Sequence, residues 1–268
     1  MLLREVEYAR PASVQEALRL LGANDGARAL AGGQTLINVM KARAASPDVL
    51  VDLANLKELR GIDLGADGTL ELGAMTTYSD IVESAEARAR PILGEVCNQI
   101  ADVQVRNRGT IGGNVCSNDP TNHLPPLLVA IGATMTIAGA DGERTVPADE
   151  FFLGVYLTAA GPGELLTKIT VPAGKSDGFA SVPIGRDGTC IVNVAASLSN
   201  GSARLAIGCV DAVPVVLTPA STSDEDVSTA VKGADLDPPS DVHASADYRR
   251  HLAGVLAGRA VGQAAGRN

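Results

Sequence analysis

Apolar positions in the first part of the chain alternate between the period of a strand and the period of a helix. The pattern predicts strands over 5–8, 27–31 and 49–53, and amphipathic helices over 14–22 and 36–44 between them. The second strand runs directly into a pair of glycines, so a tight turn must join it to the helix that follows. The sequence therefore predicts a small lobe of alternating strands and helices.

The middle of the chain mixes longer helical patterns with paired strands. Residues 70–72 alternate as a strand, 79–104 are mostly helical, and a Pro-Pro pair begins a helix over 124–131. A hairpin over 134–146 turns at Asp-Gly, and the apolar run 165–171 reads as a further strand. These elements predict a second, larger lobe.

The last third reads as an antiparallel sheet with helices. Apolar runs over 190–198, 203–210 and 213–217 predict three strands, and a helical stripe over 248–261 follows near the end. We expect an α+β arrangement in which helices cover one side of this sheet. The polar patch 173–178 is the most linker-like stretch of the chain, and the sequence predicts the domain junction there.

Composition and charge narrow the classes of function. At 268 residues the chain is long enough for two domains, since domains commonly hold roughly 100–200 residues. Its formal charge of -9 argues against a surface for nucleic acid or for anionic membranes. The sequence shows neither a signal peptide nor an apolar run of membrane-spanning length, so we expect a cytoplasmic protein without a membrane span.

Cysteine and histidine are too few and too scattered for a metal site. The four cysteines at 97, 116, 190 and 209 contain no C-x-x-C pair, and the three histidines show no ligand spacing. We therefore expect buried free thiols and no metal ion bound by this chain alone.

Two segments, 31–35 and 109–114, place adjacent glycines beside apolar runs. Glycine adopts positive φ without steric cost and leaves its amide uncovered, so each segment suits a turn that holds a phosphate. Thr35, Thr110 and Asn114 would add hydrogen bonds to the phosphate oxygens. We expect the two segments to grip the two phosphates of a dinucleotide from opposite sides. Taken singly, each glycine pair also fits an ordinary loop.

Four motifs then occur in a fixed order along nearly the whole chain. They are Ala-Gly-Gly-Gln-Thr-Leu-Ile at 31–37, Arg-Asn-Arg-Gly-Thr-Ile-Gly-Gly-Asn at 106–114, Phe-Phe-Leu-Gly at 151–154 with Pro-Gly-Glu-Leu-Leu at 162–166, and Tyr-Arg-Arg-His-Leu at 248–252 with Arg-Ala-Val at 259–261. Together they resemble the FAD-binding medium subunit of the molybdenum hydroxylases, the group that includes carbon monoxide dehydrogenase, xanthine dehydrogenase and bacterial N-heterocycle hydroxylases.

The resemblance implies an α+β fold in two domains. The first, over 1–174, would be an FAD-binding domain of the p-cresol methylhydroxylase type, with a small lobe over about 1–55 and a larger lobe over about 56–174. The second, over 178–268, would be like the C-terminal domain of the carbon monoxide dehydrogenase flavoprotein, with a three-stranded antiparallel sheet and helices.

The resemblance also implies which residues bind FAD. In the family the two glycine segments bind the pyrophosphate and its surroundings, and the first leucine after Pro-Gly-Glu lies against the isoalloxazine. On this chain the implied contacts are Leu30, Ala31, Gly32, Gly33, Gln34, Thr35, Leu36, Ile37, Thr110, Ile111, Gly112, Gly113, Asn114, His123 and Leu165. For Leu165, an ordinary strand leucine is an equally good interpretation.

Two positions depart from the family pattern. Relatives usually have an FAD-contacting aspartate where this chain has His123, although Asp119 is close in sequence. Relatives often carry a lysine near the flavin where this chain has Pro183, before the Gly185-Arg186 pair. Because a cation beside the ring stabilises reduced, negatively charged flavin, its loss predicts a lower flavin potential.

The function implied by the resemblance is electron transfer. A large subunit would hydroxylate the substrate at a molybdopterin, a small subunit would carry two [2Fe-2S] clusters, and FAD in this chain would pass the electrons to an external acceptor. A dimer of such heterotrimers is one form of the complex. Two alternatives stay open: a stand-alone flavin oxidoreductase of the same superfamily, and a flavin-free scaffold subunit.

Overall fold

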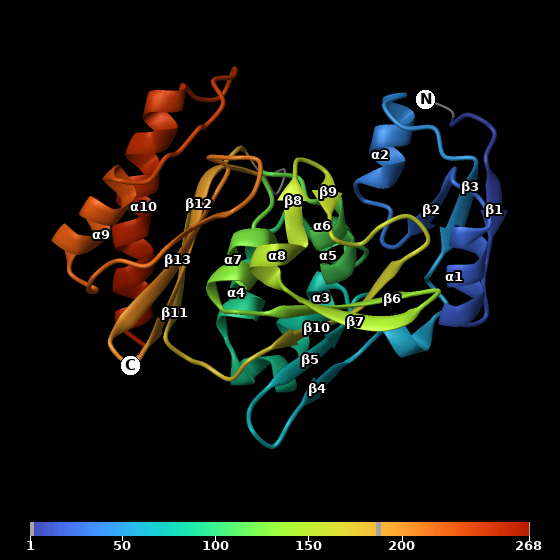
Figure 1. Cartoon of the computed structure of the whole chain (residues 1–268), viewed down its shortest axis with the longest axis horizontal. Coiled ribbons are helices and arrows are strands. Elements are labelled where there is room, and N and C mark those ends of the chain that lie inside the picture. The colour runs from blue at the N-terminus through green and yellow to red at the C-terminus, as the bar shows by residue number, and fades with distance from the viewer. Residues whose placement is uncertain (1–2, 186–188, 268) are drawn as a thin grey trace.

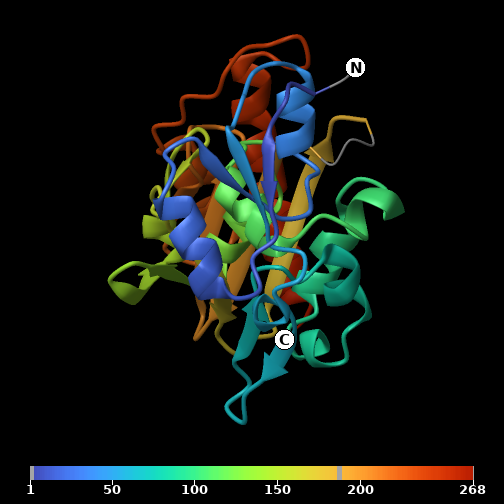
Figure 2. The same cartoon turned by 90° about the vertical axis from the view of Figure 1, so that its right-hand side faces the viewer.

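The computed structural model describes residues 3–185 and 189–267, whose elements form three groups along the long axis of the molecule (Figure 1). The N-terminal elements lie at one end, the C-terminal sheet with its helices lies at the other, and a larger central group joins them. Figure 2 looks onto the N-terminal end, with the central elements behind it and α10 farther back.

The N-terminal lobe is a parallel three-stranded sheet in the order β1-β3-β2, with two helices in the connections. Its elements are β1 (Glu7–Ala9), α1 (Val14–Gly22), β2 (Ala27–Leu30), α2 (Leu36–Lys41) and β3 (Val49–Asp52). Helix α1 begins where the Ser13 hydroxyl accepts a hydrogen bond from the amide of Glu16, which satisfies a free N–H of the first turn. All five elements predicted here are confirmed.

The core of this lobe continues into the centre of the molecule. Val14, Ala17 and Val51 are buried in one cluster with Met75 and Leu165, which belong to the central part of the chain. The small lobe and the central group therefore share apolar contacts rather than standing apart.

The central group is an antiparallel five-stranded sheet in the order β4-β5-β10-β6-β7. Its strands are β4 (Ile62–Leu64), β5 (Leu70–Gly73), β6 (Thr134–Gly139), β7 (Gly142–Pro147) and β10 (Leu165–Val171). Strand β4 was not predicted, because it is only three residues long and largely exposed. The other strands and the Asp-Gly hairpin turn are confirmed.

Helices fill the stretch between β5 and β6, and those within 78–106 and 124–130 were predicted. They are α3 (Tyr78–Glu83), α4 (Ile92–Gln99), α5 (Val103–Arg106), α6 (Ile111–Ser117) and α7 (Leu124–Ala130), with the 3₁₀ turn η2 (Glu86–Ala89) among them. Another 3₁₀ turn, η1 (Lys57–Leu59), precedes β4. After β7 come α8 (Ala148–Phe151) and a small hairpin of β8 (Phe152–Gly154) and β9 (Leu157–Thr158). Every residue of α7 is buried, as expected for a helix that is apolar on all sides.

The C-terminal sheet has four antiparallel strands in the order β11-β12-β13-β14, not the expected three. They are β11 (Asp177–Pro183), β12 (Cys190–Ser199), β13 (Ser202–Gly208) and β14 (Val215–Leu217), followed by α9 (Asp224–Lys232) and α10 (Ala246–Ala265). The additional strand is β11, and its first two residues belong to the stretch that we interpreted as a linker.

Helices cover this sheet on both faces, so the expectation of a single covered side was wrong. Val194 and Ala196 of β12 pack in the cluster that includes α10, whereas Ala195 between them packs in the central cluster with α7. Because side chains alternate across a strand, an apolar run such as β12 is buried from both sides. No helix within the described residues has the length and apolarity that crossing a membrane requires.

Candidate cofactor site

The two glycine segments, distant in sequence, lie against each other. A Cβ atom on Gly32 would stand 2.0 Å from the carbonyl oxygen of Arg108 and 3.0 Å from Cα of Gly109. A Cβ atom on Gly113 would stand 3.4 Å from Cβ of Ala31. Glycine is required at position 32 because the backbone of the second segment occupies the space that any side chain would need.

The first segment leaves a row of backbone amides without acceptors. It connects β2 to α2, and Gly33 adopts the left-handed region with φ of 74°. Within the described chain, no acceptor receives the N–H groups of residues 32–35, although the side chain of Gln34 donates to the carbonyl of Gly32 at 3.3 Å. Consecutive free amides next to a left-handed residue form an anion-binding concavity.

The second segment is helical, which corrects the prediction of an open turn. Thr110 caps α6 by accepting from the amide of Gly113 at 3.1 Å, while the amides of Ile111 and Gly112 donate to the carbonyls of Thr76 and Ala74. Gly112 is needed for close approach rather than for positive φ, since its Cβ would lie 2.6 Å from Ala74. These amides are already satisfied by the protein.

Helix α6 continues beyond Asn114 through Ser117, and the chain turns only at Asn118. Asn118 ends the helix in the left-handed conformation, with φ of 39°. Asparagine tolerates this conformation better than other side chains, so it can replace glycine at a helix end.

Asn114 offers the clearest sign of a missing partner on α6. Its Oδ1 is buried and has no hydrogen-bond partner among the described residues. Burial raises the pKa of the neighbouring Tyr78, and a hydrogen bond from the Asn114 side chain opposes that increase. A buried polar atom without a partner is costly, so Oδ1 is suited to a donor group on a bound molecule.

Apolar side chains beside the free amides are only partly covered. Leu30 at the end of β2 and Leu36 and Ile37 at the start of α2 are half-buried. Free amides, an unpaired amide oxygen and exposed apolar surface together fit a molecule that has both phosphates and apolar rings, as FAD does.

The other two implied contacts lie deeper in the protein. Leu165 is 4% exposed at the start of β10, within the core of the N-terminal lobe. His123 is 2% exposed, with Nε2 3.2 Å from Sγ of Cys190, and its ring stacks on Phe179 at 5.7 Å. Both partners of His123 belong to the C-terminal sheet, and this contact was not predictable from spacing.

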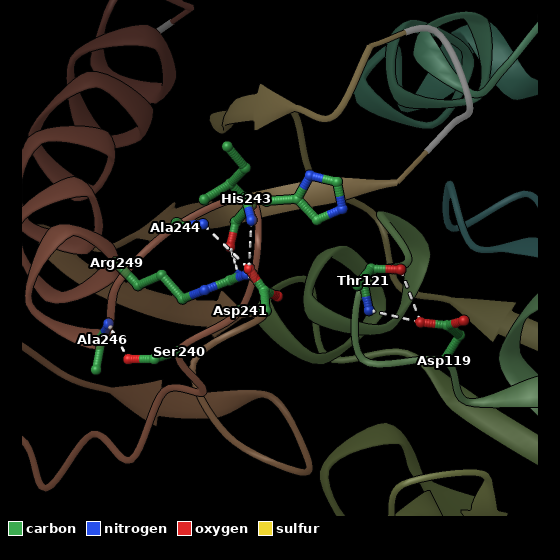
Figure 3. A network of polar contacts seen from close by, with 9 residues as sticks. Asp119, Thr121, Ser240, Asp241, His243, Ala244, Ala246 and Arg249 are labelled. Atoms are coloured by element: carbon green, nitrogen blue, oxygen red, sulfur yellow. Dashed lines mark hydrogen bonds and ion pairs between the residues drawn. The ribbon is translucent and has the colours of Figure 1, made fainter.

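Asp119, the acidic residue near His123, accepts hydrogen bonds from Thr121 and, through Oδ2 at 3.2 Å, from the hydroxyl of Tyr156. Its Oδ1 accepts from the amide and the hydroxyl of Thr121 at 2.9 and 2.7 Å (Figure 3). Pro183 is exposed at the end of β11, and Arg186 of the Gly185-Arg186 pair lies outside the described residues.

The C-terminal motif fixes α10 to the rest of its domain. Arg249 is 2% exposed and donates from Nη2 to Asp241 at 2.6 Å, while its Nη1 donates to the carbonyl of Ile191 in β12 (Figure 3). The amides of His243 and Ala244 also donate to Asp241. Arg249 thus links α10 to β12 and to the segment that precedes the helix.

Comparison with known proteins assigns this arrangement to a family. The family model described as the FAD binding domain in molybdopterin dehydrogenase matches residues 4–174, the part that holds both glycine segments. The chain belongs to the FAD-binding medium subunits of the molybdenum hydroxylase family. The relatives of this FAD-binding subunit are parts of oxidoreductase complexes.

The similarity extends over the whole length of the medium subunit. This chain is 36% identical over 284 residues to the carbon monoxide dehydrogenase medium chain of Hydrogenophaga pseudoflava, with 98% of each chain covered. It superimposes with a TM-score of 0.93 and 34% identity on a chain of the reconstituted CO dehydrogenase from Oligotropha carboxidovorans, with all of both chains covered. For a chain of quinoline 2-oxidoreductase from Pseudomonas putida 86, the TM-score is 0.91 and the sequence identity is 32%. The match covers 100% of this chain and 99% of the other. The expected fold class is thereby confirmed.

Proposed function

We propose that this subunit holds FAD and passes electrons from [2Fe-2S] clusters of a small partner subunit to an external acceptor. A large molybdopterin subunit would hydroxylate the substrate and complete the complex. The observation that carries the proposal is the row of free amides at 32–35, in a segment that packs against the one carrying the unpaired oxygen of Asn114. The term "medium chain" in the relatives' names supports partners of larger and smaller size.

The residues that would hold FAD lie in residues 1–174, between a small lobe of about 1–55 and the remainder. The amides of 32–35 would donate to the phosphates, and Leu36 and Ile37 would shield the ligand from water. Bound FAD supplies the ability to accept and release electrons singly or in pairs. The chain has four cysteines without cluster spacing, so the iron ligands would come from the partner. Its four free thiols are consistent with the cytoplasm.

The direct test is purification of the complex from its native host, followed by assays for flavin, iron and molybdenum. We expect FAD in this chain, with iron and molybdenum in two further subunits. A complex that contains FAD but no iron would contradict the electron-transfer role, and a chain that contains no flavin would contradict the cofactor site.

Replacing Asn114 with aspartate is expected to weaken FAD binding by roughly 10- to 100-fold, because a carboxylate beside the diphosphate repels it. Fluorescence titration of the flavin-free chain measures the change. Asn55, an exposed asparagine, provides the control: Asn55→Asp should bind FAD like the unaltered chain. Equal affinity in both variants would show that Asn114 does not lie beside the diphosphate.

Replacing Pro183 with lysine is expected to raise the flavin potential by about 10–30 mV, where 30 mV corresponds to about 1.4 kcal/mol for two electrons. The added cation would stabilise reduced, negatively charged flavin, and the effect should decrease at high salt because Pro183 is exposed. Redox titration of the flavin-loaded protein at two ionic strengths measures it. A potential that does not change would show that this position is remote from the flavin.

A further inference from the structure

Arg108 lies where the two glycine segments contact each other. A Cβ atom on Gly32 would stand 2.0 Å from the carbonyl oxygen of Arg108 and 2.7 Å from its carbonyl carbon. The next residue, Gly109, packs against Tyr78, since a Cβ atom on Gly109 would stand 2.6 Å from Cε2 of that ring. The amide of Tyr78 also donates to the carbonyl of Gly109 at 3.1 Å. The main chain of Arg108 is therefore fixed in contact with the first residue of the row of free amides.

The guanidinium of Arg108 is available to a bound anion. The residue is exposed, and its side chain forms neither an ion pair nor a hydrogen bond within residues 3–185 and 189–267. The neighbouring Arg106 differs, because its Nη1 donates to the carbonyls of Ile100 and Ala101 at 3.1 and 2.9 Å. An exposed arginine is usually a solvated surface residue. At position 108, however, the side chain extends from main chain that touches an anion-binding segment.

The carboxylate at this edge of the N-terminal sheet already has its own cation. Asp52 is aligned with Leu30 in the parallel register, so it lies at the edge where the first glycine segment begins. It is 8% exposed, and its Oδ2 lies 3.9 Å from Nε of Arg10. This pair is neutral overall, whereas a bound diphosphate adds one negative charge on each phosphate. Backbone amides contribute only partial positive charge, so a further cation would balance the ligand.

The second glycine segment can contribute to a phosphate site only through side chains. The amides of 111–113 are already bonded to acceptors of the protein, and the caps of α6 use the Thr110 hydroxyl as well. We propose that Arg108 binds the diphosphate of FAD with its guanidinium, an inference that rests on the proposed function. Guanidinium pairs bidentately with phosphate oxygens through charge-assisted hydrogen bonds. The first segment then supplies backbone amides, and the second supplies a full positive charge.

Titration of the flavin-free full chain with FAD and with ADP tests this assignment, because ADP has the diphosphate but no flavin. Arg108→Gln is expected to weaken the binding of both ligands by roughly tenfold, since it removes the charge but keeps a long polar side chain. The loss should shrink in about 1 M sodium chloride, where the Debye length is about 3 Å. Arg108→Lys keeps the positive charge and should recover most of the affinity for both ligands.

The matched control is Arg88→Gln. Arg88 belongs to η2, is exposed, and likewise has no side-chain ion pair or hydrogen bond in the described part of the chain. This variant should bind FAD and ADP like the unaltered chain, and circular dichroism checks that every variant is folded. Equal affinities of Arg108→Gln and Arg88→Gln, a loss confined to FAD, or a loss that neither lysine nor salt reduces would overturn the inference. An unaltered chain that bound neither ligand would instead contradict the proposed cofactor site.

Discussion

Replacing Arg90 with alanine is expected to lower the free energy of unfolding by about 3–5 kcal/mol, because the change leaves a buried carboxylate without its cation. Arg90 donates from Nε and Nη2 to Asp177 at 2.7 and 2.9 Å, and the two side chains are only 4% and 1% exposed. Its Nη1 also donates to the carbonyl of Pro172. Urea unfolding monitored by circular dichroism measures the loss.

The matched control is Arg204→Ala, which removes an ion pair with Asp149, whose side chains are 38% and 42% exposed, and one hydrogen bond from Nε to the carbonyl of Val129. Exposed pairs contribute about 0–1 kcal/mol, so this variant should remain close to the unaltered protein. The double variant Arg90→Met/Asp177→Leu should regain much of the stability lost in Arg90→Ala, since it removes both buried charges. Equal losses for Arg90→Ala and Arg204→Ala would contradict a special role for the buried pair.

The buried pair explains why the polar patch 173–178 was misinterpreted. By composition the patch is a linker, but Asp177 begins β11 and pairs with an arginine 87 positions earlier in the chain. Sequence patterns report local preferences, and they do not show that a distant cation compensates a buried carboxylate. The division into domains of 1–174 and 178–268 stays a prediction, because apolar contacts cross this junction at Phe179 and Ala195.

The packing of the two glycine segments against each other was predictable, whereas the helical conformation of the second segment was not. Adjacent glycines beside apolar runs indicate backbone that must approach something closely, and that approach is observed between Gly32 and Arg108. Glycine and asparagine disfavour helices, yet residues 111–117 are helical because Thr110 caps them and Ala74 receives the amide of Gly112. Tertiary contacts here outweigh local preference.

The contacts of His123 are a second example of tertiary contacts that the sequence pattern does not reveal. The family resemblance implied a ligand contact at this position, and the ring contacts Cys190 and Phe179 of the C-terminal sheet. Neither partner is near it in sequence, so only the folded chain reveals the contact. The FAD contact proposed for His123 therefore stays a prediction, and the packing shown here is a second role for the same residue.

Replacing Gly32 with alanine is expected to weaken FAD binding by roughly 100-fold or more, equivalent to about 2.7 kcal/mol. The new Cβ would lie 2.0 Å from the carbonyl oxygen of Arg108, so the backbones of the two segments must separate. That separation would move the free amides at 32–35 away from the segment that carries Asn114. Fluorescence titration with FAD measures the affinity, and circular dichroism checks that the variant is folded.

Two further glycines make this prediction specific to the contact between the segments. Gly22→Ala, in the same lobe, places its Cβ in open space and should leave the affinity unchanged. Gly33→Ala adds strain of about 1–2 kcal/mol at its positive φ but meets only the Ile37 and Leu30 side chains, so its loss of affinity should be intermediate. If folded Gly32→Ala bound FAD as tightly as Gly22→Ala, the close approach of the two segments would not be what creates the cofactor site.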